Sequence, residues 1–552
     1  MILRKAGLGL FFLFIITLAY NQPINRQEVN NLAALSKVWG FLKYFHPEVS
    51  KGKFDWDTVL VMNYQRVLDV KSKQEFNVLI NRIITSAGPV EPCPTCYKKE
   101  PDSLKINLNL AWMSDTSVFM PYVISRLWYI YENHYPSQNI YIKRNRKIGN
   151  AVFPGEKLYN ETSLPGREYR FLALSRFWNV INYYYPYRYL IPMPWDSIYI
   201  EFIPRMINIT SDYMYYRIIQ ELASRLNDGH GFISSHVVNI FSNRKILPFR
   251  VRTINNAEVV TNLYDTVLCR EAGVMLGDTI LSVDGLYAPI ARKHYAQYTA
   301  ASNQNYLNSQ VDYWMSIVKH NPAEVVIKRA KDTIKLEVKA LSGDIRKTLQ
   351  HSPELPFKLL NDSVGYILMS RLRENDIDPA FQLFSKTKYL IIDSRNYPNW
   401  VIYPLSKKLL NRESVFARVT EPDFQHPGLI KWVRPMKAGY NNPDYYKGKV
   451  IVLVNSETMS RAELTVMAIK KAPNVVVIGE QTAGANGDVS ILPLPGGIDV
   501  YFSGLGYYFA DYSLMQKVGI RPDIVQKPTI QGIMSQKDEI FDRALQYIKT
   551  GH

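Results

Sequence analysis

Residues 450–463 read Val-Ile-Val-Leu-Val-Asn-Ser-Glu-Thr-Met-Ser-Arg-Ala-Glu, and this stretch decides the fold. Its first five residues are all apolar, which is typical of a strand buried on both faces of a sheet. The polar residues after them predict a turn, and the spacing of apolar residues over 462–472 predicts a helix. Ser460 stands where that helix begins. The stretch therefore predicts a buried strand, a sharp turn and a helix with a serine at its N-terminus.

Two interpretations of Ser460 remain open at this point. Ser460 and Glu463 match the capping box, in which serine and glutamate each bond to the other's backbone amide. Alternatively, a serine beside the free amides and positive dipole of a helix N-terminus is well placed to attack a carbonyl, because those amides stabilise the oxyanion that forms. A serine nucleophile also requires a base, because its hydroxyl is weakly nucleophilic at neutral pH.

The sequence around this stretch predicts an α/β architecture. Short apolar runs at 389–393, 450–454 and 475–478 alternate with helical segments, which indicates a mostly parallel buried sheet covered by helices. Residues 246–341 differ, because they contain short strands. There the alternation over 280–284 predicts a half-buried strand, and Asp-Gly at 284–285 predicts a hairpin turn.

An internal repeat precedes both regions. Leu-Ser-Lys-Val-Trp at 35–39 recurs as Leu-Ser-Arg-Phe-Trp at 174–178, 139 positions later, and each copy continues to a proline and a Trp-Asp pair. Each copy predicts an amphipathic helix that ends at the proline. Two copies indicate a duplicated helical element and not a solenoid, which needs at least three repeats. We interpret the aromatic side chains as core residues without a chemical role.

Composition excludes several classes of protein. The chain has 552 residues, 13% of them aromatic, which excludes a disordered protein. Its net charge is +17. Because no run of five or more basic residues occurs, we expect no nucleic-acid partner and interpret the charge as a property of a soluble or envelope-facing surface.

The first residues resemble a secretory signal. Arg4 and Lys5 precede an uncharged, mostly apolar stretch over 8–19, which is too short to span a bilayer. We therefore expect residues 1–21 to be a signal peptide, with no transmembrane segment once they are removed. The protein is expected to be exported to the periplasm or the extracellular space, where it could associate with the envelope.

Three cysteines are too few for a disulfide scaffold. Cys93 and Cys96 fit a redox pair, half of a zinc site or a local structural disulfide. The loop context and the absence of further nearby ligands favour the disulfide. Cys269 is expected to be a buried apolar residue.

Five stretches together resemble one known family. They are Leu-Asn-Asp-Gly-His at 226–230, Leu-Gly-Asp at 276–278 with Asp-Gly at 284–285, Asn-x-x-Thr-x-Ser-x-Ala-Glu at 455–463, Gly-Glu-Gln-Thr-Ala-Gly at 479–484, and Val-Gly-Ile-x-Pro-Asp-Ile at 518–524. In this order, over residues 165–545, they resemble the tail-specific (carboxy-terminal processing) serine peptidases, and more closely their tricorn-core-like and retinoid-binding-protein-like branch with a PDZ module.

The resemblance implies Ser460 as nucleophile and restricts the choice of base. The processing-peptidase branch uses a lysine, but the matching position here is Ala485. The tricorn-like branch uses a histidine, and His230 occupies that place. A histidine can accept and return a proton near neutral pH. Gly229 stands where the tricorn-like enzymes have a serine before the histidine.

The group that orients the base is less certain from sequence. The family motif places it at Gln516, a neutral amide that can hold a tautomer but cannot stabilise a positive imidazolium as a carboxylate does. Glu463 and Asp511 are the alternatives, and the sequence does not choose between them.

The resemblance also implies an oxyanion hole made by backbone amides. One donor is the amide of Arg461, and the other lies in the loop after residues 389–393, at Asn399. Many relatives have a glycine pair where Asn399 and Trp400 stand. Asparagine tolerates positive φ better than most residues. Trp400 is harder to accommodate than glycine in a loop that must direct a backbone amide at the substrate carbonyl.

The expected fold class is α/β multidomain. The expected units are a signal peptide at 1–21, a mainly helical N-terminal domain at 22–160, the helical part of the peptidase domain with the Asp-Gly-His motif at 165–245, a PDZ-like β module at 246–342, and a ClpP/crotonase-like α/β peptidase core at 345–549. Peptide-binding residues are expected within 246–342 but cannot be named from sequence.

The expected function is that of a secreted serine endopeptidase acting on polypeptides. The PDZ-like module would receive C-terminal tails or extended segments as an added strand. No metal or organic cofactor is required by this chemistry. The alternative is a catalytically inactive peptide-binding protein on the same scaffold. The oligomeric state cannot be predicted.

Overall fold

The structure is a computed structural model that describes residues 24–94, 96, 104–134, 139–236, 245–342 and 355–552. The predicted signal peptide therefore lies outside the described residues. Within the described part, no helix is both long and apolar enough to cross a membrane. Cys93 and Cys96 form a disulfide, as expected, and Cys269 is a buried free thiol.

The N-terminal helices confirm the predicted repeat. The first copy consists of α1 (Arg26–Phe45), α3 (Trp56–Asp69) and α4 (Lys73–Ser86), with the short α2 (Pro47–Ser50) between the first two and α5 (Pro121–Asn133) packed beside them. The second copy consists of α6 (Arg167–Tyr184), α7 (Trp195–Ile207) and α8 (Asp212–Ser224). The repeat thus extends to a third helix that the tryptophan motif alone did not indicate. Ser72 and Ser211 cap the third helix of each copy in the same way.

The repeated tryptophans pair within each copy. The indole N–H of Trp39 donates to the Trp56 carbonyl at 2.7 Å, and Trp56 donates back to the Trp39 carbonyl at 2.9 Å. Trp178 and Trp195 make the same reciprocal pair at 3.3 and 3.0 Å. All four side chains are buried, so they serve as core residues, as predicted.

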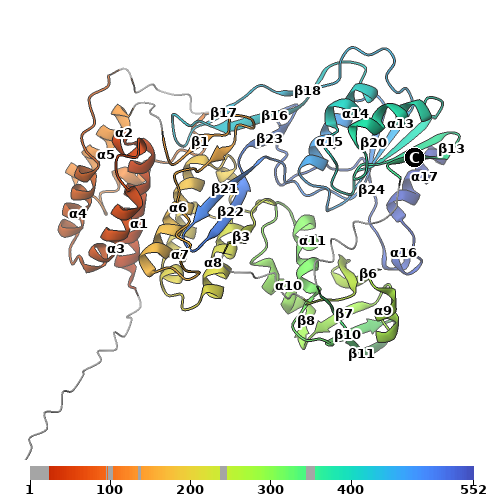
Figure 1. Ribbon diagram of the computed structural model, residues 1–552, viewed down its shortest axis with the longest axis horizontal. Coiled ribbons are helices and arrows are strands. Elements are labelled where there is room, and N and C mark those ends of the chain that lie inside the picture. The colour runs from red at the N-terminus through yellow and green to blue at the C-terminus, as the bar shows by residue number, and fades with distance from the viewer. Residues whose placement is uncertain (1–23, 95, 97–103, 135–138, 237–244, 343–354) are drawn as a thin grey trace, which may run out of the picture.

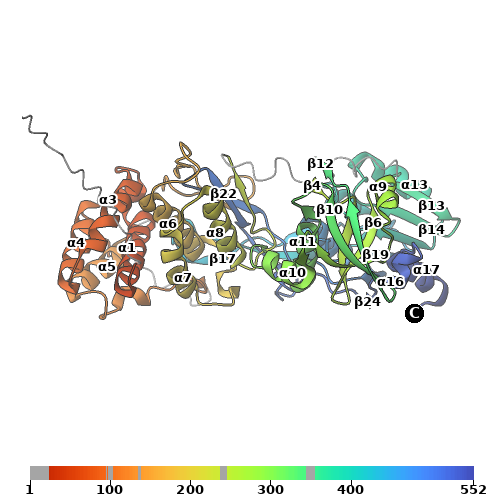
Figure 2. The ribbon, with the colours of Figure 1, turned by 90° about the horizontal axis from the view of Figure 1, so that it is seen from below.

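The two copies contact each other through equivalent positions. Lys37 of the first copy pairs with Asp196 of the second at 2.9 Å, and Arg176 of the second pairs with Asp57 of the first at 2.6 Å. Lys37 and Arg176 occupy equivalent positions in the repeat, and so do the two aspartates. Each copy therefore gives the other the same contact, which means that an approximate two-fold axis relates the copies. Figures 1 and 2 show the copies side by side at one end of the molecule.

Strands from the C-terminal half complete the core of this helical end. The hairpin of β21 (Val489–Leu494) and β22 (Ile498–Ser503) pairs with β3 (Ile233–Ser235), which follows α8. Buried residues of the hairpin, such as Leu492 and Val500, share one hydrophobic core with α1, α3, α6 and α7. In Figure 1 the blue hairpin lies against the yellow helices. The chain therefore returns to the helical units after building part of the C-terminal sheet.

The C-terminal half contains the predicted parallel sheet. Its strand order is β13-β14-β15-β19-β20-β24, and every neighbouring pair is parallel except β13 with β14. The strands are β13 (Phe357–Asn361), β14 (Val364–Leu368), β15 (Tyr389–Asp393), β19 (Lys449–Val454), β20 (Val475–Gly479) and β24 (Ile524–Val525).

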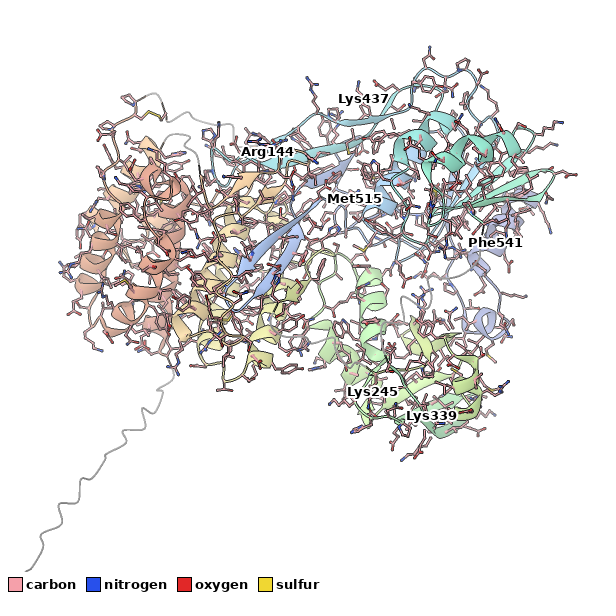
Figure 3. All side chains as sticks on the ribbon, viewed as in Figure 1. Arg144, Lys245, Lys339, Lys437, Met515 and Phe541 are labelled. Atoms are coloured by element: carbon pink, nitrogen blue, oxygen red, sulfur yellow. A yellow bond between two sulfur atoms is a disulfide. The ribbon has the colours of Figure 1, made fainter. Side chains whose placement is uncertain are left out.

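Helices cover both faces of this sheet. One face packs against α13 (Ile377–Leu383), α14 (Ile402–Leu409) and α15 (Arg461–Ile469). The other face packs against α17 (Glu539–Thr550), which follows the short α16 (Ile530–Met534). Figure 3 labels Phe541 on α17, at this end of the molecule. This arrangement explains why the strand sequences are apolar throughout and do not alternate.

A second, antiparallel sheet connects the two ends of the molecule. Its long strand β16 (Ser414–Pro422) pairs with β17 (Ile430–Trp432), β18 (Met436–Ala438) and β23 (Gly506–Phe509). Arg144, on β1 (Lys143–Arg144), donates to the Glu421 carboxylate at 2.8 Å and ties this sheet to the short hairpin of β1 and β2 (Ala151–Val152). Figure 3 shows Arg144 at the helical end of the sheet.

Residues 245–342 form a separate β module below the parallel sheet in Figure 1. Its main sheet has the order β11-β10-β7-β6-β5. The elements are β5 (Phe249–Ile254), β6 (Ala257–Leu263), α9 (Thr266–Ala272), β7 (Thr279–Val283), β8 (Leu286–Tyr287), α10 (Ala288–Ala296), α11 (Gln304–Met315), β10 (Ala323–Arg329) and β11 (Asp332–Val338). Asp284 and Gly285 both have positive φ and join β7 to β8, as the predicted hairpin turn requires.

Candidate active site

Ser460 lies at the junction of β19 and α15 in a strained backbone conformation. It is the residue before the first helical turn, with φ 55° and ψ −121°. Few residues other than glycine adopt positive φ, and a strained residue of this kind persists only where its surroundings hold it. The Ser460 amide donates to the Ala485 carbonyl at 2.8 Å and to the Glu463 carboxylate at 3.2 Å. A strained serine between a buried strand and a helix is the local geometry of a serine nucleophile.

The residues between β19 and Ser460 fix the turn. The Asn455 side-chain oxygen accepts from the amides of Glu457 and Thr458, each at 3.0 Å. The Thr458 hydroxyl in turn donates to the Ser394 carbonyl at 3.0 Å. Asn455 and Thr458 of the family motif therefore have structural roles, and they connect the serine turn to the loop after β15.

Glu463 is fully buried, and its carboxylate bonds both to Ser460 and to the 482–485 segment. Besides the Ser460 amide, its carboxylate accepts from the Gly484 amide at 2.8 Å, the Ala485 amide at 3.1 Å and the Thr482 hydroxyl. Burial raises the pKa of Glu463 to about 7, although these four donors favour the ionised form. The expected role of Glu463 as the group that orients His230 is not what the structure shows, since its hydrogen bonds go to the 482–485 segment and to Ser460.

His230 follows α8 and is buried, with 5% of its surface exposed. Its ring nitrogen Nδ1 lies 3.0 Å from the hydroxyl of Ser503 on β22. The Ser503 hydroxyl also lies 2.9 Å from a carboxylate oxygen of Asp228 and donates to it. Asp228 itself lies 3.8 Å from the ring and accepts from the backbone amides of His230 and Ser503.

The contacts from His230 through Ser503 to Asp228 form a relay. This relay determines which ring nitrogen of neutral His230 carries the proton. The single hydroxyl proton of Ser503 goes to the Asp228 carboxylate, so Ser503 can only accept from His230. Neutral His230 is therefore protonated at Nδ1, which leaves Nε2 free to accept a proton. Burial lowers the pKa of His230, while Asp228 and Asp488 raise it less strongly. His230 is thus neutral at neutral pH, as a general base must be.

Close packing brings the histidine turn to the serine turn. A Cβ atom added to Gly229 would lie 2.6 Å from the Cβ of Ala485, which is closer than any side chain can approach. Ala485 is the residue whose carbonyl accepts from the Ser460 amide. The structure therefore joins the His230 and Ser460 turns through one residue, at the position where a lysine base is expected in the other branch.

The same packing explains why Gly229 departs from the family pattern. There is no space for a serine side chain before His230, and the Gly229 amide donates to the Ser302 hydroxyl at 2.7 Å. Ser503 supplies the hydroxyl beside Nδ1 from another strand. Sequence reasoning missed Ser503 and gave Asp228 no role. The Asp-Gly-His motif was a signal for Asp228, but no local pattern marks Ser503.

Neither remaining candidate for orienting the base contacts the imidazole. The Gln516 amide nitrogen donates to Asp228 and to Ser302, each at 3.3 Å, so it supports the carboxylate and not the ring. Asp511 is exposed in a surface turn, where it accepts from Ser513. Neither residue therefore orients the ring directly, and the carboxylate near it is that of Asp228, at 3.8 Å.

The predicted oxyanion donors lie on two adjoining segments. The Arg461 amide is the first of α15, a position whose amide has no partner within the helix. The Asn399 side chain donates to the Leu372 carbonyl at 2.9 Å and anchors the loop after β15. Asn399 is absent from the described residues with positive φ, so the loop does not use the backbone freedom expected of this asparagine. Trp400 is accommodated because 51% of its surface is exposed.

A cavity of about 480 Å³ adjoins the histidine turn. Gly229, Gly231 and Glu457 line it on the catalytic side, and residues of the β module line the other side. Arg250 of β5 pairs with Glu457, and Arg252 pairs with Glu480 at 3.0 Å, so the β module is docked directly on the serine turn. The remaining lining residues include several aromatic side chains, namely Tyr216, Phe232, Tyr264, Tyr298, Tyr306, Tyr313 and Trp314.

A family match supports the class of a serine-type peptidase. Residues 408–526 match the family model described as Peptidase family S41, which confirms the expected peptidase family for this part of the chain. The tricorn-like branch and the PDZ module stay predictions. The match includes Ser460 but neither His230 nor the β module. No curated protein matches the chain.

Solved structures share the fold at low sequence identity. Mature CPAF in complex with lactacystin is 14% identical, with a TM-score of 0.55 over 69% of this chain and 98% of that chain. A CPAF mutant is 13% identical, with a TM-score of 0.56 over 70% of this chain and 98% of that chain. The photosystem II D1 C-terminal processing protease is 16% identical, with a TM-score of 0.40 over 66% of this chain and 96% of that chain. The two CPAF structures therefore share the fold of this chain.

Proposed function

We propose that this chain is a secreted serine endopeptidase in which Ser460 is the nucleophile and His230 the general base. The observation that carries the proposal is the contact of the His230 turn with Ala485, which holds the strained Ser460. His230 Nε2 would take the proton of Ser460 as its oxygen attacks a peptide carbonyl. The proton would then pass to the leaving amine, and water would release the acyl group.

The position of the β module supports a role in binding the substrate. The module borders the cavity beside His230 and offers strand edges to an extended chain, as a PDZ-like module does when it adds a peptide as a strand. A polypeptide held there would lie next to the catalytic turns. We propose that the module binds C-terminal tails or extended segments in this way, and that the protein acts after export to the periplasm or outside the cell.

Labelling tests the nucleophile. A fluorophosphonate probe is expected to label the full chain at Ser460, and Ser460→Ala should lose the label. Ser456→Ala, four residues earlier in the same turn, is the matched control and should keep it. Binding of tail peptides to the full chain without labelling or turnover would contradict catalysis and favour the inactive peptide-binding protein.

The relay behind His230 gives a second test. In Asp228→Asn the imidazolium loses its stabilising charge, so kcat should fall about 10²- to 10⁴-fold. Because the Asp228 carboxylate raises the pKa of His230, its removal should also move the acid limb of kcat/KM to lower pH. Both effects are read from pH–rate profiles with a peptide substrate.

Asp499→Asn is the control for the relay, since Asp499 lies on the same strand β22 but pairs with His236 at 2.7 Å. It should change neither kcat nor the pH profile. An acid limb that stays in place in Asp228→Asn, or that moves to higher pH, would remove Asp228 from the mechanism.

A further inference from the structure

Two exposed aromatic side chains contact Arg461, the residue that follows the proposed nucleophile, and a third lies beside them. Tyr397 and Trp400, in the loop after β15, and Tyr403 on α14 have 53%, 51% and 40% of their surfaces exposed. The rings of Trp400 and Tyr403 lie 6.4 Å apart. The Arg461 guanidinium lies 5.3 Å from the Tyr397 ring centre and 5.4 Å from that of Trp400. We refer to Tyr397, Trp400 and Arg461 as the aromatic clamp.

The protein holds the clamp in place from its backbone. The Arg461 guanidinium donates to the Pro398 carbonyl at 3.3 Å, between the two aromatic residues in sequence. Asn399 is anchored to Leu372, and Val401, immediately after Trp400, is buried in the core. The side chains are thus exposed on a fixed loop and stacked on a cation, a geometry that keeps their rings oriented.

We propose that the aromatic clamp binds the side chain of the substrate residue whose carbonyl Ser460 attacks, and that it selects a large apolar or aromatic side chain there. This inference rests on the proposed function. The carbonyl oxygen of that substrate residue would accept from the Arg461 amide. The Cβ atom of the same residue is two bonds from the carbonyl carbon, only one bond more than the oxygen. The side chain that begins at this atom then meets the Arg461 side chain and the loop that carries Tyr397 and Trp400. Aromatic rings and a guanidinium offer stacking faces to such a side chain.

Two peptides that differ in one residue test the inference. Cleavage sites are first mapped by mass spectrometry on denatured casein digested by the full chain. One site is then synthesised with phenylalanine or with alanine before the scissile bond. The wild type should cleave the phenylalanine peptide about 10- to 100-fold better in kcat/KM. Trp400→Ala and Tyr397→Ala should lose most of this preference, measured in each variant as the ratio of kcat/KM for the two peptides.

Trp432→Ala is the matched control. Trp432 has 47% of its surface exposed and packs against Tyr508 and Tyr512, away from the clamp. It should keep the preference for phenylalanine. A wild type without preference, or clamp variants that keep it, would overturn the inference while leaving the peptidase intact. Cleavage that persists in Ser460→Ala, or no cleavage of any peptide by the wild type, would overturn the proposed function and the inference with it.

Discussion

His230→Ala is expected to lower kcat/KM by about 10⁴- to 10⁶-fold while the protein stays folded. Without the imidazole no group takes the proton from Ser460, and the hydroxyl alone is a weak nucleophile. The 482–485 segment that supports Ser460 does not depend on the ring, because its hydrogen bonds go to Glu463. Folding is checked by thermal unfolding, and turnover is measured with the peptide cleaved by the wild type.

The wild-type pH profile should agree with this role. Burial lowers the pKa of His230 below its ordinary value near 6.5. A base must be neutral, so kcat/KM should rise with pH through one ionisation whose midpoint lies below 6.5 and then stay level. His236→Ala is the control, since His236 is half-exposed and pairs with Asp499. Turnover that survives in His230→Ala would exclude histidine from the mechanism.

Sequence alone predicted the parts of the site that local patterns mark. The apolar strand and the helix start on either side of Ser460 were predicted, and both elements are present. The family resemblance, and not this pattern alone, indicated Ser460 as the nucleophile. The predicted repeat is also present. It could be predicted because the paired tryptophans and the prolines recur at a constant spacing in the sequence. Its third helix was missed because α4 and α8 share a serine cap and have similar lengths, 14 and 13 residues, but little sequence.

The relay behind His230 could not be predicted because it depends on a contact between distant segments. Ser503 reaches Nδ1 only because β22 pairs with β3, which follows the histidine turn. Nothing in the sequence of β22 indicates that pairing. Glu463 differs from Ser503, because its capping pattern with Ser460 was visible in the sequence. Its hydrogen bonds to the 482–485 segment were not. The sequence motifs and the family resemblance therefore indicated Ser460 and His230 as candidates, and long-range pairing supplied the groups that hold them.

The buried charges between the two helical copies should make Arg176 essential for stability. Arg176 bonds to Asp57 at 2.6 Å and to Glu156 at 2.7 Å, and Lys43 bonds to the same two carboxylates at 3.0 and 2.8 Å. None of the four side chains has more than 4% of its surface exposed. Burial alone would raise the pKa of Asp57, but Lys43 and Arg176 outweigh it and hold that pKa well below its ordinary value.

Arg176→Met is therefore expected to lower the free energy of unfolding by about 3 to 5 kcal/mol, because it leaves two buried carboxylates facing one lysine. Lys37→Met is the matched control at the equivalent position of the first copy. Its partner Asp196 is half-exposed at 48%, so the loss should be at most about 1 kcal/mol. Urea unfolding followed by tryptophan fluorescence measures both, because the paired tryptophans lie in this core. Equal losses in the two variants would show that the approximate symmetry, and not burial, sets the strength of these pairs.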